Sequence, residues 1–333
     1  MKKILLFLLT FLFVFSVTGC GKYSESDVVK DLDKKLNKLK SYQVEGKLEI
    51  VNNDDVYNYD VVVSYKKKDY YKVSLKNTAN NHEQIILKNT DGVYVLTPSL
   101  NKSFKFQSDW PYSNSQIYLL ESLRDDIKND DTREFTSNKN SYEFVTKVNY
   151  PNNRKLTSQK ITLDKELKPR VVKVLNEEKV PQMTMTFTDI DYSPTFKDDF
   201  FQLDIAMKSA KVDDSVVTTS QLDDVIYPLA TPTGTKLVSE EKVKKTNGER
   251  VIMTFEGEKP FLLVEETASV EDEMTVIPTY GDIYQLMDTL GVMTDNSLTW
   301  TSAGIEYYLV SDVMGTEELV EIAQSINVLP TMK

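Results

Sequence analysis

Residues 43–50 read Gln-Val-Glu-Gly-Lys-Leu-Glu-Ile, and they mark the point at which the chain changes its periodicity. Val44, Gly46, Leu48 and Ile50 occupy every second position, and charged or amide side chains fill the positions between them. Such alternation is typical of a β-strand with one buried face and one solvated face. The residues before this stretch repeat at helical spacing instead. The sequence therefore predicts a helix that leads into a sheet.

The same alternation recurs on the C-terminal side of this stretch. We predict strands at 59–65, 71–75, 85–87, 93–97, 104–106, 142–148, 159–163, 170–175 and 183–188. The turn pair Asp91-Gly92 and the short polar connections indicate an antiparallel meander. Apolar residues at helical spacing predict one helix within it, over 117–127, and residues 129–140 are expected to form a polar loop.

A helix is predicted from Glu25 to Lys40, ahead of the first strand. One of its faces carries the apolar residues Val28, Leu32, Leu36 and Leu39. Ser24 and Asp27 stand at the spacing of a capping box. Five lysines lie elsewhere on the helix, so its outer face either is simply solvated or rests on a membrane surface.

The N-terminus carries the pattern of a signal peptide. Met1-Lys2-Lys3 is followed by an almost wholly apolar run from Ile4 to Val17, which is shorter than the roughly 20 residues of a membrane-spanning helix. Val17-Thr18-Gly19-Cys20 then resembles the bacterial lipobox, in which the cysteine receives a lipid. We therefore predict a signal peptide over residues 1–19, lipidation of Cys20 and a tether over 20–26. The alternative is a transmembrane anchor with an incidental cysteine.

The charge and composition exclude several functions. The formal net charge is -11, with 51 acidic against 40 basic residues, whereas a nucleic-acid partner requires a basic face. The same charge indicates that membrane attachment depends mainly on the lipid anchor. One cysteine and one histidine leave no internal disulfide and no Cys/His zinc site, so we expect no metal and no cofactor. His82 lies in a polar turn and is expected to be exposed.

The sequence shows no catalytic constellation. Adjacent acidic pairs such as Asp125-Asp126 and Asp130-Asp131 lack the spacing of a calcium loop, and a solvated acidic surface explains them. Carboxylates that act together in glycosidases come from distant positions, so the sequence leaves such a pair open. We expect a binding protein and not an enzyme, and we assign no catalytic residue.

A second, smaller domain is predicted over residues 221–333, after a polar linker over 205–220. Strands are expected at 235–238, 249–255, 261–266, 297–301 and 305–310, together with two helices. For the first helix, Ile283, Leu286, Met287 and Leu290 have the spacing i, i+3, i+4, i+7 of one apolar face. For the second, Thr316 is a suitable N-cap.

Ordered segments within residues 25–203 are similar to the LolA/LolB/RseB-like lipoprotein-carrier superfamily. The segments are Ser41-Tyr42-Gln43-Val44-Glu45-Gly46, Tyr70-Tyr71-Lys72-Val73, Thr90-Asp91-Gly92-Val93-Tyr94-Val95-Leu96-Thr97-Pro98, Trp110-Pro111, Ile161-Thr162-Leu163-Asp164, Pro169-Arg170-Val171 and Met185-Thr186-Phe187-Thr188-Asp189-Ile190. Together with the lipobox, they make the chain resemble Gram-positive, membrane-anchored lipoproteins of sporulation and germination. The C-terminal part is similar to a domain of unknown function that accompanies such chains.

The resemblance implies an α+β fold. A strongly curved antiparallel sheet, or incomplete β-barrel, is expected over 27–204, with helices on its concave side and a small α+β domain after it. In the carriers that concavity takes acyl chains. Trp110, Tyr112, Tyr118, Met183 and Met185 are the candidates to line it, because methionine and aromatic side chains adapt to irregular ligands. Ordinary core packing is the alternative for each of them.

We therefore expect an extracytoplasmic lipoprotein, held on the cell membrane by Cys20, that binds a lipid, an acyl group or a lipoprotein. The alternative is a scaffold or sensor with a filled core, which binds an envelope protein and no lipid. The carriers that cross a periplasm are free, whereas a tethered protein cannot carry lipid far. The predicted tether thus favours a stationary role.

Overall fold

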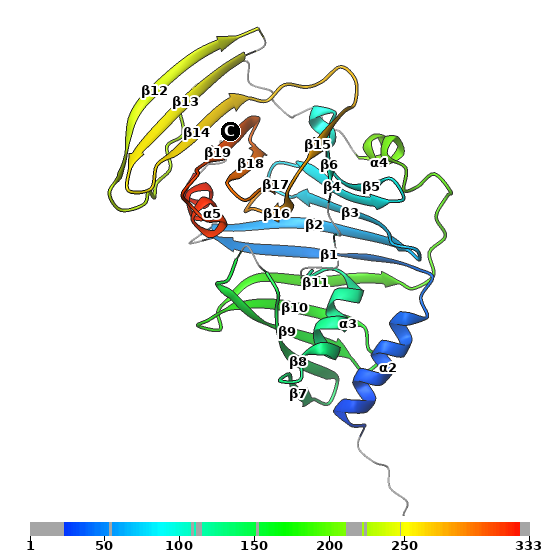
Figure 1. Cartoon of the computed structure of the whole chain (residues 1–333). Coiled ribbons are helices and arrows are strands. Elements are labelled where there is room, and N and C mark those ends of the chain that lie inside the picture. The colour runs from blue at the N-terminus through cyan, green and yellow to red at the C-terminus, as the bar shows by residue number, and fades with distance from the viewer. Residues whose placement is uncertain are drawn as a thin grey trace, which may run out of the picture.

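The computed structural model describes residues 23–52, 55–107, 110, 115–150, 153–210, 222, 225–246 and 248–326. These residues form two sheets and four α-helices (Figure 1). The helices are α2 (Glu25–Asn37), α3 (Leu120–Asn129), α4 (Leu203–Ser209) and α5 (Thr316–Ser325), with a 3-10 turn η1 (Pro98–Leu100). The larger sheet contains β1 (Ser41–Asn52), β2 (Asp55–Lys66), β3 (Tyr70–Asn77), β4 (Glu83–Asn89), β5 (Gly92–Thr97), β6 (Lys102–Phe106), β7 (Glu134–Ser137), β8 (Ser141–Lys147), β9 (Leu156–Asp164), β10 (Pro169–Asn176), β11 (Pro181–Asp191) and β15 (Thr275–Thr279). The smaller sheet contains β12 (Thr235–Lys245), β13 (Gly248–Gly257), β14 (Phe261–Thr267), β16 (Asp282–Gln285), β17 (Leu290–Met293), β18 (Ser297–Ser302) and β19 (Ile305–Val310).

Strand β1 contains the alternating stretch 43–50 and lies in the middle of the larger sheet, between β2 and β11. Val44 is buried and Glu45 is exposed, as the alternation predicts. A bulge falls between Glu45 and Gly46, opposite β11, and bulges bend a sheet locally. A Cβ atom at Gly46 would lie 2.5 Å from the carbonyl oxygen of Thr186, so this position has room only for glycine.

The larger sheet has the strand order β15-β6-β5-β4-β3-β2-β1-β11-β10-β9-β8-β7. Its neighbouring strands are antiparallel, except that β15 runs parallel to β6. The end strands β15 and β7 do not pair with each other in the described part of the chain, so the sheet does not close into a barrel. The predicted α+β class with a mainly antiparallel sheet is confirmed.

Helices cover both faces of the larger sheet. Leu32 of α2 and Ile127 of α3 share a buried cluster with strand residues on one face. On the other face, Met207 of α4 packs with Ile85 and Leu87 of β4. Strands β4 and β5 are therefore buried on both faces, which explains why their apolar residues run without alternation. That α2 and α3 lie on a concave side stays a prediction.

The smaller sheet has the order β12-β13-β14-β19-β18-β17-β16, and α5 packs against its buried face through Leu319 and Ala323. Strand β15 leaves this part of the chain and joins the edge of the larger sheet beside β6 (Figure 1). The buried ammonium of Lys102 in β6 forms an ion pair with Glu306 of β19. The division into domains at 204 and 221 stays an interpretation, but β15 crosses it.

The helix predicted over 283–290 is wrong. The structure has β16, a tight turn and β17 there, and the Leu286 amide donates a hydrogen bond to the Thr289 carbonyl across the turn at 2.9 Å. Short apolar runs fit a helix and a hairpin about equally well. The hairpin forms because Tyr284 and Leu290 both reach buried positions from it.

Other boundaries also differ from the sequence prediction. Within the predicted linker 205–220, residues 205–209 belong to α4, and residues 211–220 lie outside the described residues. Strand β7 occupies part of the predicted loop 129–140. Helix α2 ends at Asn37, before the predicted Lys40, and its predicted Ser24–Asp27 capping box is confirmed.

Residues 1–22 lie outside the described residues, and so do the predicted signal peptide, the lipidation site Cys20 and the first part of the tether. Within the described ranges, no helix combines the length and the apolar character needed to cross a membrane.

Candidate functional site

A cavity of about 650 Å³ lies between the larger sheet and the C-terminal part of the chain. The ends of β1, β9 and β11 and the middle of β4 contribute to one wall, and the β16–β17 hairpin with α5 contributes to the other. This volume falls within the range of about 300–1,000 Å³ that ligand pockets usually have. The cavity therefore forms only when segments that are distant in the sequence come together.

Apolar side chains make up much of both walls. The larger sheet and the chain near α3 contribute Ile50, Ile86, Trp110, Tyr118, Leu156 and Met183. The hairpin and α5 contribute Leu286, Met287, Leu290 and Val320. With Tyr150 and Tyr284, the lining includes four aromatic rings and two methionines, and such side chains adjust to irregular apolar ligands. These walls suit the apolar part of a ligand.

Buried hydrogen bonds hold the hairpin against the larger sheet. The Tyr59 hydroxyl donates to the carbonyl oxygen of Met287 at 2.6 Å. The Gln84 Oε1 atom accepts from the Leu290 amide at 2.5 Å and from the Thr289 hydroxyl at 3.0 Å. Because an unmade buried hydrogen bond is costly, these contacts specify one position for the hairpin. They therefore set the width of the cavity.

The rim of the cavity is charged. Arg154 Nε lies 3.3 Å from Glu317 Oε1, and Lys155 Nζ lies 2.7 Å from Glu321 Oε1. These pairs join the chain before β9 to α5. Their side chains are largely solvent-exposed, so each pair contributes little stability. A polar rim around apolar walls is an arrangement that suits an amphipathic ligand.

Tyrosine hydroxyls lie deeper in the cavity wall. Burial raises the pKa of Tyr118 and Tyr150, so both phenols stay neutral. The buried Tyr150 hydroxyl has no hydrogen-bond partner within the described residues. Its hydrogen-bonding capacity is therefore unused by that part of the chain, and it is shielded from solvent. Nearby, burial raises the pKa of Asp126 to about 6, although Gln159 and Ser115 both donate to its carboxylate.

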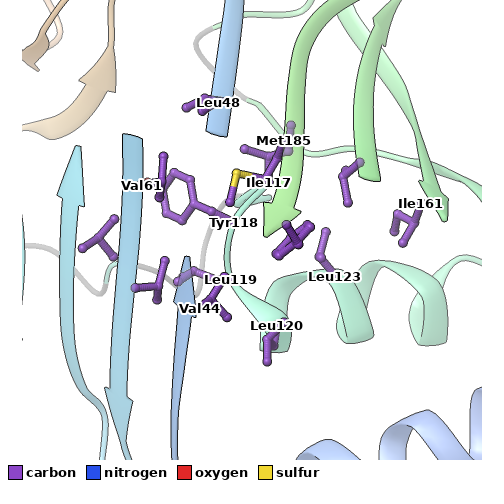
Figure 2. Close-up of a cluster of buried hydrophobic side chains, with 14 of the residues drawn as sticks. Val44, Leu48, Val61, Ile117, Tyr118, Leu119, Leu120, Leu123, Ile161 and Met185 are labelled. Carbon is purple, nitrogen blue, oxygen red and sulfur yellow. The ribbon is translucent and has the colours of Figure 1, made fainter. Parts of the chain in front are cut away.

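The region of the larger sheet under α3 contrasts with the cavity, because the chain's own side chains fill it. Figure 2 shows Ile117 beside Met185 and Leu119 beside Val44, with Leu120 at the start of α3. All five are buried. An acyl chain could enter this region only by displacing them.

The structure brings some of the predicted site residues together. Trp110, Tyr118 and Met183 line the cavity. Met185 is fully buried in the core and is not part of the cavity wall, and Tyr112 lies outside the described residues. Whether the first three bind a ligand stays a prediction.

The sequence does not indicate the cavity residues of the C-terminal part. The spacing of Leu286, Met287 and Leu290 predicts a helix, and nothing in it places these residues against β4. The signal that was available is the uninterrupted apolar run of β4, which indicates that both of its faces are covered. It does not say by which segment.

The prediction that His82 is exposed is wrong. The side chain is half-buried, and its Nε2 atom is buried without a hydrogen-bond partner in the described part of the chain. Burial lowers the pKa of His82 to about 4, so the imidazole is neutral at physiological pH. It does not line the cavity.

Comparison with known proteins gives matches along most of the chain. A family profile described as "Sporulation protein YdcC-like" matches residues 1–201. The sporulation protein YdcC of Bacillus subtilis (strain 168) is 36% identical over 329 residues, which is 98% of this chain and 97% of the relative. The crystal structure of MucB in complex with MucA(peri) covers 90% of this chain and 97% of its own, with 15% identity and a TM-score of 0.33. A LolA superfamily protein from Nitrosomonas europaea covers 53% of this chain and 98% of its own, with 13% identity and a TM-score of 0.29.

Proposed function

Because the chain belongs to the Sporulation protein YdcC-like family, we propose that it acts in the cell envelope during sporulation, as a stationary lipoprotein that binds an amphipathic, acyl-bearing ligand. Family membership confirms the sporulation-protein type that the sequence predicts. The cavity between the sheets is the proposed binding site. The role is binding and not catalysis.

The observation that carries the proposal is the combination of apolar walls and a charged rim in one cavity of about 650 Å³. An acyl chain would lie against Ile86, Met183 and Met287, and its polar end would face the rim. Tyr150 also lines the cavity, and its buried, unpartnered hydroxyl could bond to an ester or amide group only after the wall shifts to expose it. These features support a ligand with an apolar body and a polar end.

The ligand is tested with the full-length protein, purified after lipidation and analysed by native mass spectrometry with lipid extraction. We expect bound acyl-bearing molecules in addition to the covalent anchor. Met183→Glu places a carboxylate on the apolar wall and should reduce the bound fraction by about 10-fold or more, since burying a charge is costly. Met274→Glu is the matched control, because Met274 is partly exposed and does not line the cavity.

Two results would contradict this assignment. One is a purified protein that takes up no fluorescent fatty acid after delipidation. The other is equal loss of ligand in both methionine variants, provided that circular dichroism shows both to be folded.

Attachment through Cys20 is tested separately. The lipobox supports lipidation, and Cys20 is the only cysteine in the sequence. Cys20→Ala should abolish the mass increase that diacylglycerol adds to the protein. The variant should also lose its tight association with the membrane. If wild type and variant differed only by the mass of the Cys-to-Ala substitution, the anchor would be excluded. The cavity test would not be affected.

A scaffold role is the second candidate, and two observations favour it. The region under α3 is filled (Figure 2), and the C-terminal part exposes Leu229 and Val238. Deleting the C-terminal part would also remove β15 from the larger sheet, so surface variants are the better test. Leu229→Asp with Val238→Asp should abolish retention of a specific envelope protein that wild type retains. Val180→Asp, at another exposed valine, serves as the control.

A further inference from the structure

A row of lysines follows the outer face of α2. Lys30, Lys34 and the C-cap residue Lys38 are spaced by four residues, so they lie on one side of the helix. This side is about opposite the one that buries Leu32 and Leu36. All three lysines are exposed. The described chain begins at Tyr23, only three residues after Cys20 in the sequence, so this row starts beside the predicted anchor.

A second group of lysines meets the end of this row. The Lys67 amide donates a hydrogen bond to the Lys40 carbonyl at 2.7 Å, which places the β2–β3 turn next to the chain that leaves α2. Lys67 and its neighbour Lys68 are exposed, and so is Lys40. We call Lys34, Lys38, Lys40, Lys67 and Lys68 the lysine surface. It joins two segments that the sequence separates by some 25 residues.

Few acidic groups lie near the lysine surface, and most of them already have hydrogen-bond or ion-pair partners. Asp27 caps the start of α2, Asp31 accepts from the Tyr23 hydroxyl, and Asp33 pairs with Lys128 at 3.1 Å. Asp69 lies in the β2–β3 turn itself. Within the described residues, no lysine of the lysine surface forms an ion pair. In a chain of net charge -11, this is a local concentration of uncompensated positive charge.

We propose that the lysine surface rests on the anionic headgroups of the bilayer and holds α2 along the membrane. This rests on the proposed anchor at Cys20. Four peptide units from Cys20 to Ser24 reach at most about 14 Å when fully extended. The start of α2 must therefore stay near the bilayer, and the charges farther along decide whether the helix lies down or stands up.

The strength of this contact follows from membrane electrostatics. One lysine near an anionic surface is worth about a five-fold preference, and the effect decays within a Debye length of about 8–10 Å at physiological salt. Lys67 and Lys68 lie at the far end of α2, about 20 Å from its start for 13 residues at 1.5 Å rise. They gain this preference only if α2 lies along the surface. The lysine surface thus fixes an orientation, while the anchor fixes the location.

The test uses the full lipidated protein in vesicles of phosphatidylcholine alone and of phosphatidylcholine with phosphatidylglycerol. Hydrogen exchange is measured for α2 and for the β2–β3 turn. We expect turn amides to exchange at least about five-fold more slowly on the anionic vesicles, and the difference to disappear near 1 M salt, where the Debye length is about 3 Å. Lys34→Glu/Lys38→Glu/Lys67→Glu should abolish the difference.

The matched control is Lys173→Glu/Lys236→Glu/Lys244→Glu, which makes the same charge change at exposed lysines outside the lysine surface and should keep the protection. Equal exchange on both kinds of vesicle would overturn the proposal. Protection by soluble inorganic polyphosphate in the absence of anionic vesicles would also overturn it, because it would show a site for free anions. A failed anchor is distinguishable, since the protein would then not float with neutral vesicles.

Discussion

Two regions of the larger sheet, one under α3 and one beside β4, differ in which segment of the chain covers them. Under α3, the segment 117–127 follows the meander directly and fills the sheet with its own apolar side chains. Beside β4, the cover is the β16–β17 hairpin, which comes from much farther along the chain and leaves a cavity of about 650 Å³. The local cover thus packs an apolar core, with a second pocket of about 590 Å³ beside α3 that Leu119, Asp126 and Lys147 help to line. The distant cover leaves the cavity that has walls from both parts of the chain.

The largest expected effect tests the apolar core under α3. Leu120 is buried under α3 (Figure 2), so Leu120→Ala should lower the free energy of unfolding by about 2–5 kcal/mol. Urea denaturation followed by circular dichroism measures it. Leu229→Ala is the control at an exposed leucine and should stay within about 0.5 kcal/mol of wild type. Similar values for both variants would mean that the region under α3 is not packed as described.

The next largest effect concerns the hydrogen bonds that hold the β16–β17 hairpin against β4. Gln84→Leu leaves the Leu290 amide and the Thr289 hydroxyl without their acceptor, at a cost of about 1–3 kcal/mol. The cost should fall on the hairpin first. Hydrogen exchange of residues 282–293 should become faster than that of β1. Uniform acceleration across both sheets would contradict a local role for Gln84.

The third prediction concerns Asp126 of α3 and the pH dependence of the free energy of unfolding. Burial raises the pKa of Asp126 to about 6, so the folded state binds a proton that the unfolded state releases near pH 4. Stability from this group is therefore present below about pH 4 and is lost as the pH rises to about 6. Asp126→Asn should remove that fall and should raise stability at pH 7 by about 1–2 kcal/mol. Unfolding midpoints measured from pH 4 to pH 7 check it, and an unchanged profile would contradict it.

The smallest effect is expected at the rim of the cavity. Arg154 and Glu317 are 3.3 Å apart but largely exposed. Glu317→Gln should change the free energy of unfolding by less than about 0.5 kcal/mol, because solvent screens such pairs. Thermal melts at low and high salt measure this. A loss well above that value would mean that the rim holds α5 in place and that the cavity is closed more firmly than its exposed ion pairs indicate.

The sequence was informative where periodicity and local chemistry act alone. The alternation over 43–50 predicted β1, and Ser24 with Asp27 predicted the start of α2. Trp110, Tyr118 and Met183 were named as cavity candidates, and the structure places all three on one wall. The resemblance to the carrier superfamily predicted a cavity, and the side chains of these residues suit apolar ligands.

The sequence was misleading where distant contacts decide the structure. The spacing of Ile283, Leu286 and Leu290 satisfies a helix, but Gln84 and Tyr59 provide hydrogen bonds that only a hairpin in this position can use. Met183 and Met185 lie on the same face of β11, two residues apart. Met183 pairs with Ile50 at the end of β1 beside the cavity, whereas Met185 pairs with Leu48 farther into the sheet and is fully buried in the core against Gly46. Neither outcome is encoded within a short window of residues.

Strand β15 has a consequence for the order in which the molecule is completed. The free edge of β6 receives its partner only from residues 275–279, long after the rest of the larger sheet has been synthesised. Until then β6 presents unpaired amides and carbonyls, which are a template for any other extended chain. A chain that stalls before this point would therefore be prone to pair with a neighbour. The arrival of β15 pairs the edge of β6 and makes β15 the end strand, whose Pro278 has no amide to donate to another chain.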